Sequence, residues 1–438
     1  MSVAITNVVR QVGTGRVLAG MSLTNALAQL GLEPDVRGEG VVWTHRQTEG
    51  ADWYFVAAPT AQGFRGTLRF RAVGTVELWN PLTGEVTPAG VVRREGGTSL
   101  VALDLPPSGS VFVAFRSPGQ AVPNRVVRLE HDGTTVADVQ ETRGPTIIPQ
   151  VISASYGDPA NPARRKDVSA LVRQDLARGL TTITAQNAWA GGDPASNTVK
   201  RVFVLVRLPD GQETRLEARE GEALTLLDSL PVPRAAGEIL DGGARLLAWE
   251  PGVYRATRED GTTSTWDTRA PRRLPLAGPW NLAFPAGWGA PETLRLDTLG
   301  SWTELNLPPE ARAFSGTVTY TTEFTLPPRA PGERVELDLG RVEVIANVRL
   351  NGESVGTVWS PPYRLDLTHL AKPGVNRLTV TVTSTWFNRL VYDAGLAEKA
   401  RKTWTISGPA KGRALLPAGL LGPVALHIGQ TLGAGEAK

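Results

Sequence analysis

Two turn signals within residues 337–389 constrain the fold of this chain more than any other feature. Asn351-Gly352 separates two extended apolar runs, and Pro373-Gly374 precedes an alternating run that begins at Val375. Asn-Gly is the strongest short hairpin signal, because a type I′ turn needs positive φ at both central residues. Pro-Gly followed by alternation indicates a turn and then a strand. The stretch is therefore predicted to be a meander of antiparallel strands with one apolar and one polar face.

Length and composition extend this prediction to the whole chain. A chain of 438 residues exceeds one ordinary core, which favours several domains. Frequent Gly (47) and Pro (33) between short apolar runs favour all-β architecture with many turns. The net charge of +3 gives no reason to expect nucleic acid or an anionic membrane as a partner.

Cysteine content and the N-terminal residues leave the compartment open. The chain has no Cys, so it has neither a disulfide framework nor a thiolate site. Its first residues lack the charged region and long apolar core of a secretory signal, and no run approaches the roughly 18 apolar residues of a membrane span. The localisation is therefore unknown from sequence.

The predicted organisation is mainly β, with tandem β-sandwich domains that end in a jelly roll. Residues 1–40 differ, because short strands there precede a helix in which Ser22 is the predicted N-cap and Gly31 the C′ residue. In chain order the predicted units are a remnant of an α/β domain (1–40), a β-sandwich (41–117), a connector (118–149), a small β-rich module (150–230), connecting strands (231–273), a jelly roll (274–430) and a disordered tail (431–438).

Motifs in the C-terminal part resemble two families of glycoside hydrolases. The sugar-binding, galactose-binding-like jelly roll of family 2 enzymes is resembled by Asp338-Leu339-Gly340, Val348-Arg349-Leu350-Asn351-Gly352, Gly356, Trp359, residues 362–368 and residues 374–378. The C-terminal part of family 106, the α-L-rhamnosidases, is resembled by Gly278-Pro279-Trp280, residues 287–292, Ser301-Trp302-Thr303, residues 314–317 and residues 386–390. Residues 41–115 resemble the β-sandwich that follows the catalytic region in those enzymes.

The family 106 resemblance implies a catalytic domain that this chain lacks. In that family a (β/α)-barrel precedes the β domains and holds the catalytic acid, the base and a bound calcium, and members are often periplasmic or extracellular. No stretch here matches such a barrel, so no catalytic residue, metal site or cofactor is assigned to this chain. Residues 1–40 are expected to expose an apolar patch where a partner barrel would pack.

Six residues are candidates for carbohydrate binding. An aromatic ring stacks on the apolar face of a sugar while amide and guanidinium groups bond its hydroxyls, which suits Trp386, Asn388 and Arg389. Trp359 and Tyr363 flank a rigid Pro-Pro loop and suit either a groove rim or a domain interface. The resemblance to family 2 enzymes places Glu343 near the substrate, although a surface strand position explains it as well. The first three residues equally suit an edge that covers the sandwich.

Three hypotheses for the function remain open at this point. The chain is a non-catalytic accessory portion that binds a rhamnose-containing glycan or supports a catalytic barrel from the same or an adjacent gene. Alternatively it is an active α-L-rhamnosidase, although no spacing among its carboxylates marks the acid and base pair that glycosidases need. The third hypothesis is a structural β scaffold without a ligand.

Overall fold

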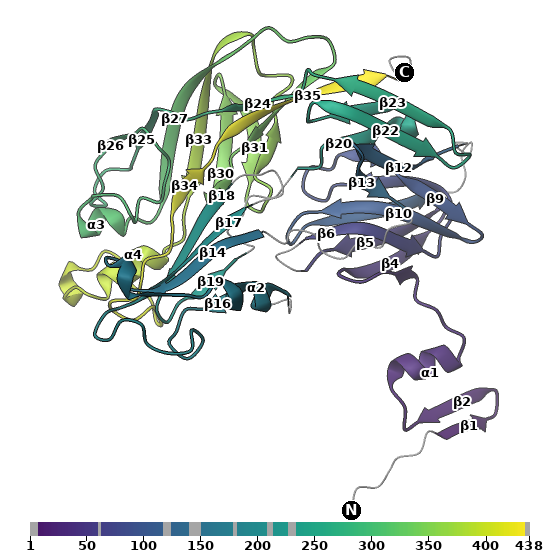
Figure 1. The fold of residues 1–438 in the computed structure, drawn as a ribbon, viewed down its shortest axis with the longest axis horizontal. Coiled ribbons are helices and arrows are strands. Elements are labelled where there is room, and N and C mark those ends of the chain that lie inside the picture. Colours follow the sequence, from purple (N-terminus) through teal and green to yellow (C-terminus); the bar gives the residue numbers. More distant parts are fainter. Residues whose placement is uncertain are drawn as a thin grey trace, which may run out of the picture.

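The structure is a computed structural model that describes residues 8–59, 63–116, 124–139, 150–177, 182–207, 213–226 and 234–433. Strands dominate these residues, and the helices are short. Figure 1 shows two groups of packed β-sheets beside each other and an N-terminal segment that lies apart from both. The prediction of a mainly β chain is confirmed. Among the described residues, no helix is long and apolar enough to cross a membrane.

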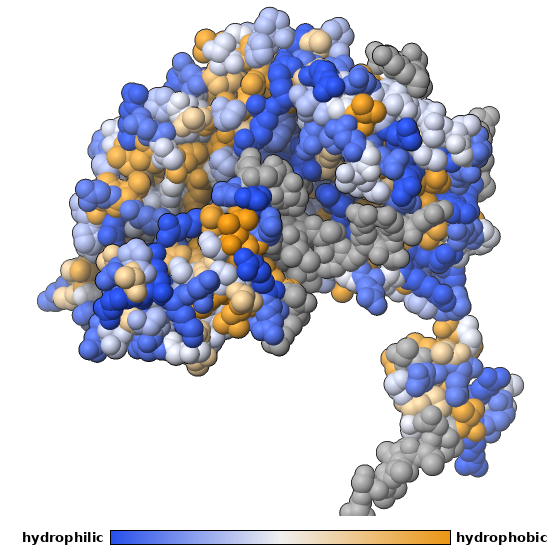
Figure 2. All heavy atoms as spheres, in the orientation of Figure 1, coloured by the Kyte–Doolittle hydropathy of each residue, from blue (hydrophilic) through white to orange (hydrophobic). Residues whose placement is uncertain are grey.

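The N-terminal arm comprises the hairpin of β1 (Val8–Val12) and β2 (Gly15–Ala19) followed by helix α1 (Leu23–Gln29). As predicted, the Ser22 hydroxyl accepts a hydrogen bond from the Asn25 N–H (3.2 Å), and Gly31 adopts positive φ after the helix. The arm leaves its large apolar side chains exposed, namely those of Val9, Val12, Val17, Leu23, Leu27, Leu30 and Leu32. Figure 2 shows orange, hydrophobic residues among hydrophilic ones on this segment, which lies apart from the rest of the molecule. The expected apolar surface is therefore present.

The first β-sandwich packs two antiparallel sheets, with orders β3-β6-β10-β9 and β4-β5-β11-β7-β8, around one core. Tyr54, Phe70 and Phe115 are the largest fully buried side chains of that core, and their rings meet edge to face or tilted. The strands are β3 (Val36–Arg37), β4 (Val42–Thr48), β5 (Ala51–Ala57), β6 (Phe64–Phe70), β7 (Thr75–Trp79), β8 (Val86–Pro88), β9 (Val92–Glu95), β10 (Thr98–Leu105) and β11 (Ser110–Arg116).

A further sheet joins residues 118–149 and residues 231–273, two segments that were predicted to be a connector and connecting strands. Its order is β13-β12-β22-β23, so strands within 118–149 pair with strands within 231–273. The sheet shares a core with β9 and β10 of the first sandwich and with β20 and β21. The connector is thus part of a packed layer rather than a simple link. Its strands are β12 (Val126–His131), β13 (Thr134–Asp138), β22 (Gly252–Arg258) and β23 (Thr263–Thr268), and β20 and β21 are Gly237–Leu240 and Arg245–Ala248.

The small module has a four-stranded sheet of order β15-β14-β17-β18, with helix α2 (Ser169–Ala177) packed on β14. A separate two-stranded ladder, β16 with β19, completes the described part of its core. The remaining elements are β14 (Gln150–Gly157), β15 (Arg165–Asp167), β16 (Thr182–Thr184), β17 (Arg201–Arg207), β18 (Glu213–Arg219) and β19 (Ala223–Thr225).

The C-terminal jelly roll packs a sheet of order β26-β25-β27-β33-β30-β31 against one of order β20-β21-β35-β28-β32, to which β24 adds at β35. Its strands are β24 (Arg272–Pro275), β25 (Trp280–Ala283), β26 (Thr293–Leu296), β27 (Thr317–Leu326), β28 (Glu333–Asp338), β29 (Arg341–Glu343), β30 (Ile345–Leu350), β31 (Glu353–Val358), β32 (Arg364–Asp366), β33 (Gly374–Thr383), β34 (Gly419–Gly422) and β35 (Ala425–Gly433). Two short helices, α3 (Pro309–Arg312) and α4 (Phe387–Asp393), lie at one end of it.

The hairpin that the sequence predicted most strongly is present between β30 and β31. Asn351 (φ 53°) and Gly352 (φ 89°) both adopt positive φ, and Leu350 pairs with Glu353. This register places Ala346, Val348 and Leu350 in the core and leaves alternate residues on the outer face. The hairpin and the two faces of β30 are therefore confirmed, but the prediction of a single meander is wrong, because β28 and β32 belong to the other sheet and β33 lies between β27 and β30.

A buried tyrosine ties β27 to the short strand β34, and it supports a stability prediction. The Tyr320 hydroxyl accepts a hydrogen bond from the Leu420 N–H (3.2 Å) in a fully buried environment. In Tyr320→Phe that N–H loses its partner, so we expect unfolding to cost about 1–2 kcal/mol less. Chemical denaturation measures this difference. Tyr392→Phe, at a partly exposed ring, is the control and should change little; equal effects of both variants would contradict the assignment.

Candidate functional site

One end of the six-stranded sheet gathers most of the predicted carbohydrate-binding residues. Strand β33 ends at Thr383, which pairs with Ile345 at the start of β30, and Val358 at the end of β31 pairs with Ala346. Glu343 ends β29, with one residue between it and β30, Trp359 follows β31, and Trp386 follows β33. Residues from three separate parts of the sequence therefore leave the sheet at the same end, where α3 and α4 also lie (Figure 1).

An aromatic pair, in which Trp386 is exposed and Trp288 is half-buried, marks this end of the jelly roll. Trp386 is 51% exposed just before α4, and its ring lies against that of Trp288 with centroids 5.5 Å apart. Trp288 sits in a glycine-rich loop, where a Cβ on Gly289 would come within 2.3 Å of the Glu310 side chain. The glycine thus lets the loop lie close over Glu310, which brings Trp288 beside Trp386. The two indoles form a surface of the kind on which a sugar ring stacks.

A network of charges, buried at Arg389 and Asp393 and partly exposed at Glu310 and Lys402, supports the aromatic pair. The Arg389 guanidinium is 1% exposed and pairs with Glu310 (3.0 Å) and with Asp393 (2.9 Å), which is itself 2% exposed. Lys402 also pairs with Glu310, at 3.0 Å. The Arg389 and Lys402 charges both lie over the Trp288 ring, at 5.7 and 6.0 Å from its centroid. Two cations and two carboxylates balance here, so the frame beneath the indoles is neutral overall.

Both carboxyl groups of this network ionise more readily than usual. Hydrogen bonds from Lys402 and then Arg389 lower the pKa of Glu310. Burial acts to raise the pKa of Asp393, but hydrogen bonds from Thr403 and Arg389 outweigh it and lower that pKa. A general acid in a glycosidase needs the opposite, a carboxyl group whose pKa is raised. These two groups are therefore suited to holding structure rather than to donating a proton.

Buried side chains of α4 fix the loop that follows it. Asp393 accepts hydrogen bonds from the backbone N–H groups of Lys402 (3.0 Å) and Thr403 (2.7 Å). Asn388, which is 3% exposed, donates to the Leu416 carbonyl and accepts from the Leu416 N–H, both at 2.8 Å. Between these two anchors Trp404 is 81% exposed. The loop therefore presents a further indole, that of Trp404, to solvent from a fixed base.

The six predicted residues occupy different environments in this structure. Trp386 is exposed, whereas Asn388 and Arg389 are buried and bonded to other protein groups. Asn388 holds the loop at Leu416, and Arg389 holds Glu310 and Asp393, so both support the surface without facing solvent. Glu343 pairs with Arg341 at 2.7 Å. Burial, together with the Glu343 charge, raises the pKa of Tyr363, so these two side chains are near each other. Trp359 is 50% exposed.

Four residues of this surface were not among the sequence candidates: Trp288, Glu310, Lys402 and Trp404. None lies in the strands β28 to β33, whose motifs resemble the family 2 jelly roll. Their mutual contacts depend on the packing of α3, α4 and two loops. The glycines on both sides of Trp288 were the available sequence signal for a tight, exposed loop. Within the described residues, no group of three or more His, Asp or Glu side chains is arranged to hold a metal ion.

Family comparisons match the region of the family 2 motifs and most of the first β-sandwich, whereas the motifs between 278 and 390 that resemble family 106 lie outside the alpha-L-rhamnosidase match. Residues 310–411 match the glycosyl hydrolase 2 galactose-binding domain-like family, and residues 3–92 match the alpha-L-rhamnosidase family. The first match spans α3, α4 and the Lys402 loop, and the second spans the N-terminal arm and most of the first sandwich. The resemblance stated from the sequence is confirmed.

Individual relatives agree with these matches. A putative beta-glucuronidase from Formosa agariphila is 31% identical over 292 residues, which is 60% of this chain and 24% of that protein. The structure of a rhamnosidase from Novosphingobium sp. PP1Y has a similar fold, with a TM-score of 0.56 and 23% identity over 96% of this chain and 27% of that one. The chain thus spans about a quarter of the length of these relatives. It is a glycoside-hydrolase-related protein with homology to the rhamnosidase families.

Proposed function

We propose that this chain forms the non-catalytic β-domains of an α-L-rhamnosidase-like glycoside hydrolase and binds carbohydrate at the α3–α4 end of its jelly roll. In this proposal the catalytic barrel comes from another part of the same protein or from an adjacent gene. The relatives support the choice of a rhamnose-containing glycan as the ligand. In this proposal the catalytic residues belong to that barrel.

The half-exposed Trp386 ring, which packs against Trp288, is the observation that carries the binding proposal. Aromatic side chains normally bury most of their surface, so a half-exposed Trp held by a buried ion network indicates a contact surface. The network beneath it is neutral, because Arg389 and Lys402 are matched by Glu310 and Asp393. A neutral sugar that stacks through its apolar face suits this surface, since such a ligand needs no compensating charge.

The N-terminal arm supports the part of the proposal that concerns a catalytic barrel. A two-stranded hairpin with a seven-residue helix is too small to be stable alone in water. Its exposed valines and leucines therefore favour packing against another domain. The alpha-L-rhamnosidase match includes this arm, which favours a barrel of that family as the domain that covers it.

Substitution of Trp386 tests the carbohydrate site. In Trp386→Ala the stacking surface is lost, so we expect affinity for methyl α-L-rhamnoside to fall at least about tenfold, measured by isothermal titration calorimetry. Val375→Ala removes an exposed apolar group at the opposite end of the same sheet and should leave affinity unchanged. Equal affinities of wild type and Trp386→Ala would contradict the site, and so would an equal loss in Val375→Ala.

A further inference from the structure

A second surface, on the first β-sandwich, carries an unusual row of cations. Arg37 on β3 pairs directly with Arg69 on β6, and Leu100 on β10 pairs with both Arg69 and Arg93. Directly paired residues of an antiparallel sheet point to the same face. Three guanidinium groups therefore share one row across four adjacent strands. Like charges placed directly opposite each other destabilise a sheet, so the Arg37–Arg69 pairing opposes folding.

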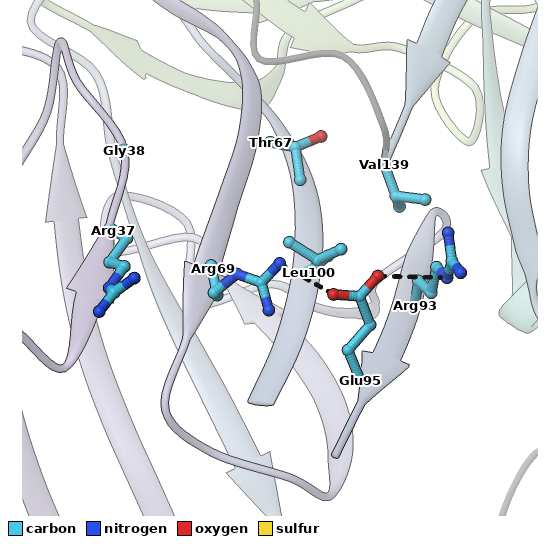
Figure 3. A pocket seen from close by; sticks show the side chains of 8 residues that line it. All are labelled: Arg37, Gly38, Thr67, Arg69, Arg93, Glu95, Leu100 and Val139. Atoms are coloured by element: carbon cyan, nitrogen blue, oxygen red, sulfur yellow. Dashed lines mark hydrogen bonds and ion pairs between the residues drawn. The ribbon is translucent and has the colours of Figure 1, made fainter. Parts of the chain in front are cut away.

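The row lines an open hollow of about 400 Å³ whose floor is apolar. Figure 3 shows Arg69 and Arg93 on either side of Glu95, with Arg37 on the far side of Arg69. Half-buried Leu100 and buried Val139 supply apolar surface between and above these charges. The Thr67 hydroxyl is engaged, because it donates to the Asp138 carbonyl (2.6 Å). The hollow thus combines an apolar floor with a cationic rim.

Carboxylates of the chain neutralise this rim only in part. Glu95 accepts from Arg69 at 2.8 Å and lies 3.5 Å from Nε of Arg93, so one carboxylate serves two cations. Arg37 pairs with Glu33 (2.7 Å), which is 65% exposed. The only contact that Arg93 makes with another charged group of the described residues is through Nε, which leaves its two terminal nitrogens able to donate. The hollow therefore keeps a positive charge and outward donors.

We propose that this hollow binds an anionic group of a saccharide, either a carboxylate or a sulfate ester. Guanidinium groups bind such groups through paired, charge-assisted hydrogen bonds, and an anion held over the row offsets its positive charge. The apolar floor formed by Leu100 and Val139 suits the C–H face of the attached sugar ring. The volume is in the range of small-ligand sites. This site is separate from the Trp386 surface and does not depend on it.

Calorimetric titration of the full chain tests the proposal. The ligands are D-glucuronate, glucose 6-sulfate, inorganic sulfate and, as the uncharged control, D-glucose. We expect at least one anionic sugar to bind, with affinity that falls as salt is raised, while glucose does not bind. Arg93→Gln should weaken that binding about tenfold or more, since it removes a charge-assisted contact. Arg269→Gln replaces an exposed arginine far from the hollow and should have no effect.

Each remaining outcome would overturn the proposal. Saturable binding of inorganic sulfate alone would mean an adventitious ion only, and the proposal that the ligand is a saccharide would be wrong. Equal binding of glucose and glucuronate, or no binding of any anion at 10 mM, roughly the weakest useful range for a small ligand, would exclude the site.

Arg93→Lys keeps the positive charge and separates loss of charge from loss of folding, because it should retain part of the affinity. Trp386→Ala should leave anion binding unchanged, so the two sites fail independently.

Discussion

Replacing Arg389 by Met is expected to lower the free energy of unfolding of the jelly roll by about 3–5 kcal/mol. The Arg389 guanidinium is 1% exposed and pairs with Asp393, which is 2% exposed. Without the cation, Asp393 keeps its negative charge in a buried position, and Glu310 loses one of its two partners. Removal of one member of a buried pair is costly because the other member stays desolvated and uncompensated. Urea denaturation followed by tryptophan fluorescence measures the change.

Two further variants make this result specific to the buried pair. Arg349→Met removes an exposed guanidinium whose one hydrogen-bond partner among the described residues is the Gly352 carbonyl, so it should change stability by less than about 0.5 kcal/mol. The double variant Arg389→Met with Asp393→Asn should be less destabilised than the sum of the two single variants, because the unpaired charge is gone. A loss below about 1 kcal/mol in Arg389→Met would contradict the role of the network.

His427 is expected to make the jelly roll lose up to about 3 kcal/mol of stability between pH 6.5 and pH 4. The ring lies on β35, on the outer face of its sheet, facing Asp338, Arg234, Arg364 and Arg273. Burial lowers its pKa to about 4 from 6.5, and the arginines add to this, whereas Asp338 opposes it.

The sign of this effect follows from proton binding. The unfolded chain binds a proton at His427 near pH 6.5, whereas the folded chain resists protonation until about pH 4. Stability is therefore complete above pH 6.5 and falls as the pH is lowered through this window. Urea denaturation at pH 7.5 and pH 4.5, compared between wild type and His427→Gln, measures the effect. The variant should lose clearly less stability on acidification, since it has no group that titrates there. Parallel losses in both proteins would mean that other groups cause the decline.

Local sequence signals predicted the elements whose conformation depends on a few adjacent residues. The Asn351–Gly352 hairpin and the Ser22 helix cap follow from backbone chemistry that acts over two or three residues. The two faces of β30 follow from alternation along that strand. The family resemblance rested on such motifs as well, and it correctly identified the relatives of both matched regions.

Contacts between distant segments could not be derived in the same way. The pairing of β12 with β22 depends on register between strands far apart in the chain, which no turn specifies. For this reason residues 118–149 looked like a connector. The burial of Asn388 and Arg389 follows from the packing of α4 against α3 and the loop to Leu416, so their sequence suggested ligand contacts instead. The Arg37–Arg69–Leu100–Arg93 row likewise exists only once four strands are aligned.

The most direct test of the central claim is a titration of the purified chain with 4-nitrophenyl α-L-rhamnoside, in which binding heat and nitrophenol release are followed on the same sample. The proposed accessory role predicts saturable binding that depends on Trp386, with release no faster than in a heat-denatured control. Turnover above that control would contradict the non-catalytic role and place an active site within these β domains. Absence of binding by the folded chain would instead contradict the carbohydrate site at the end of the jelly roll.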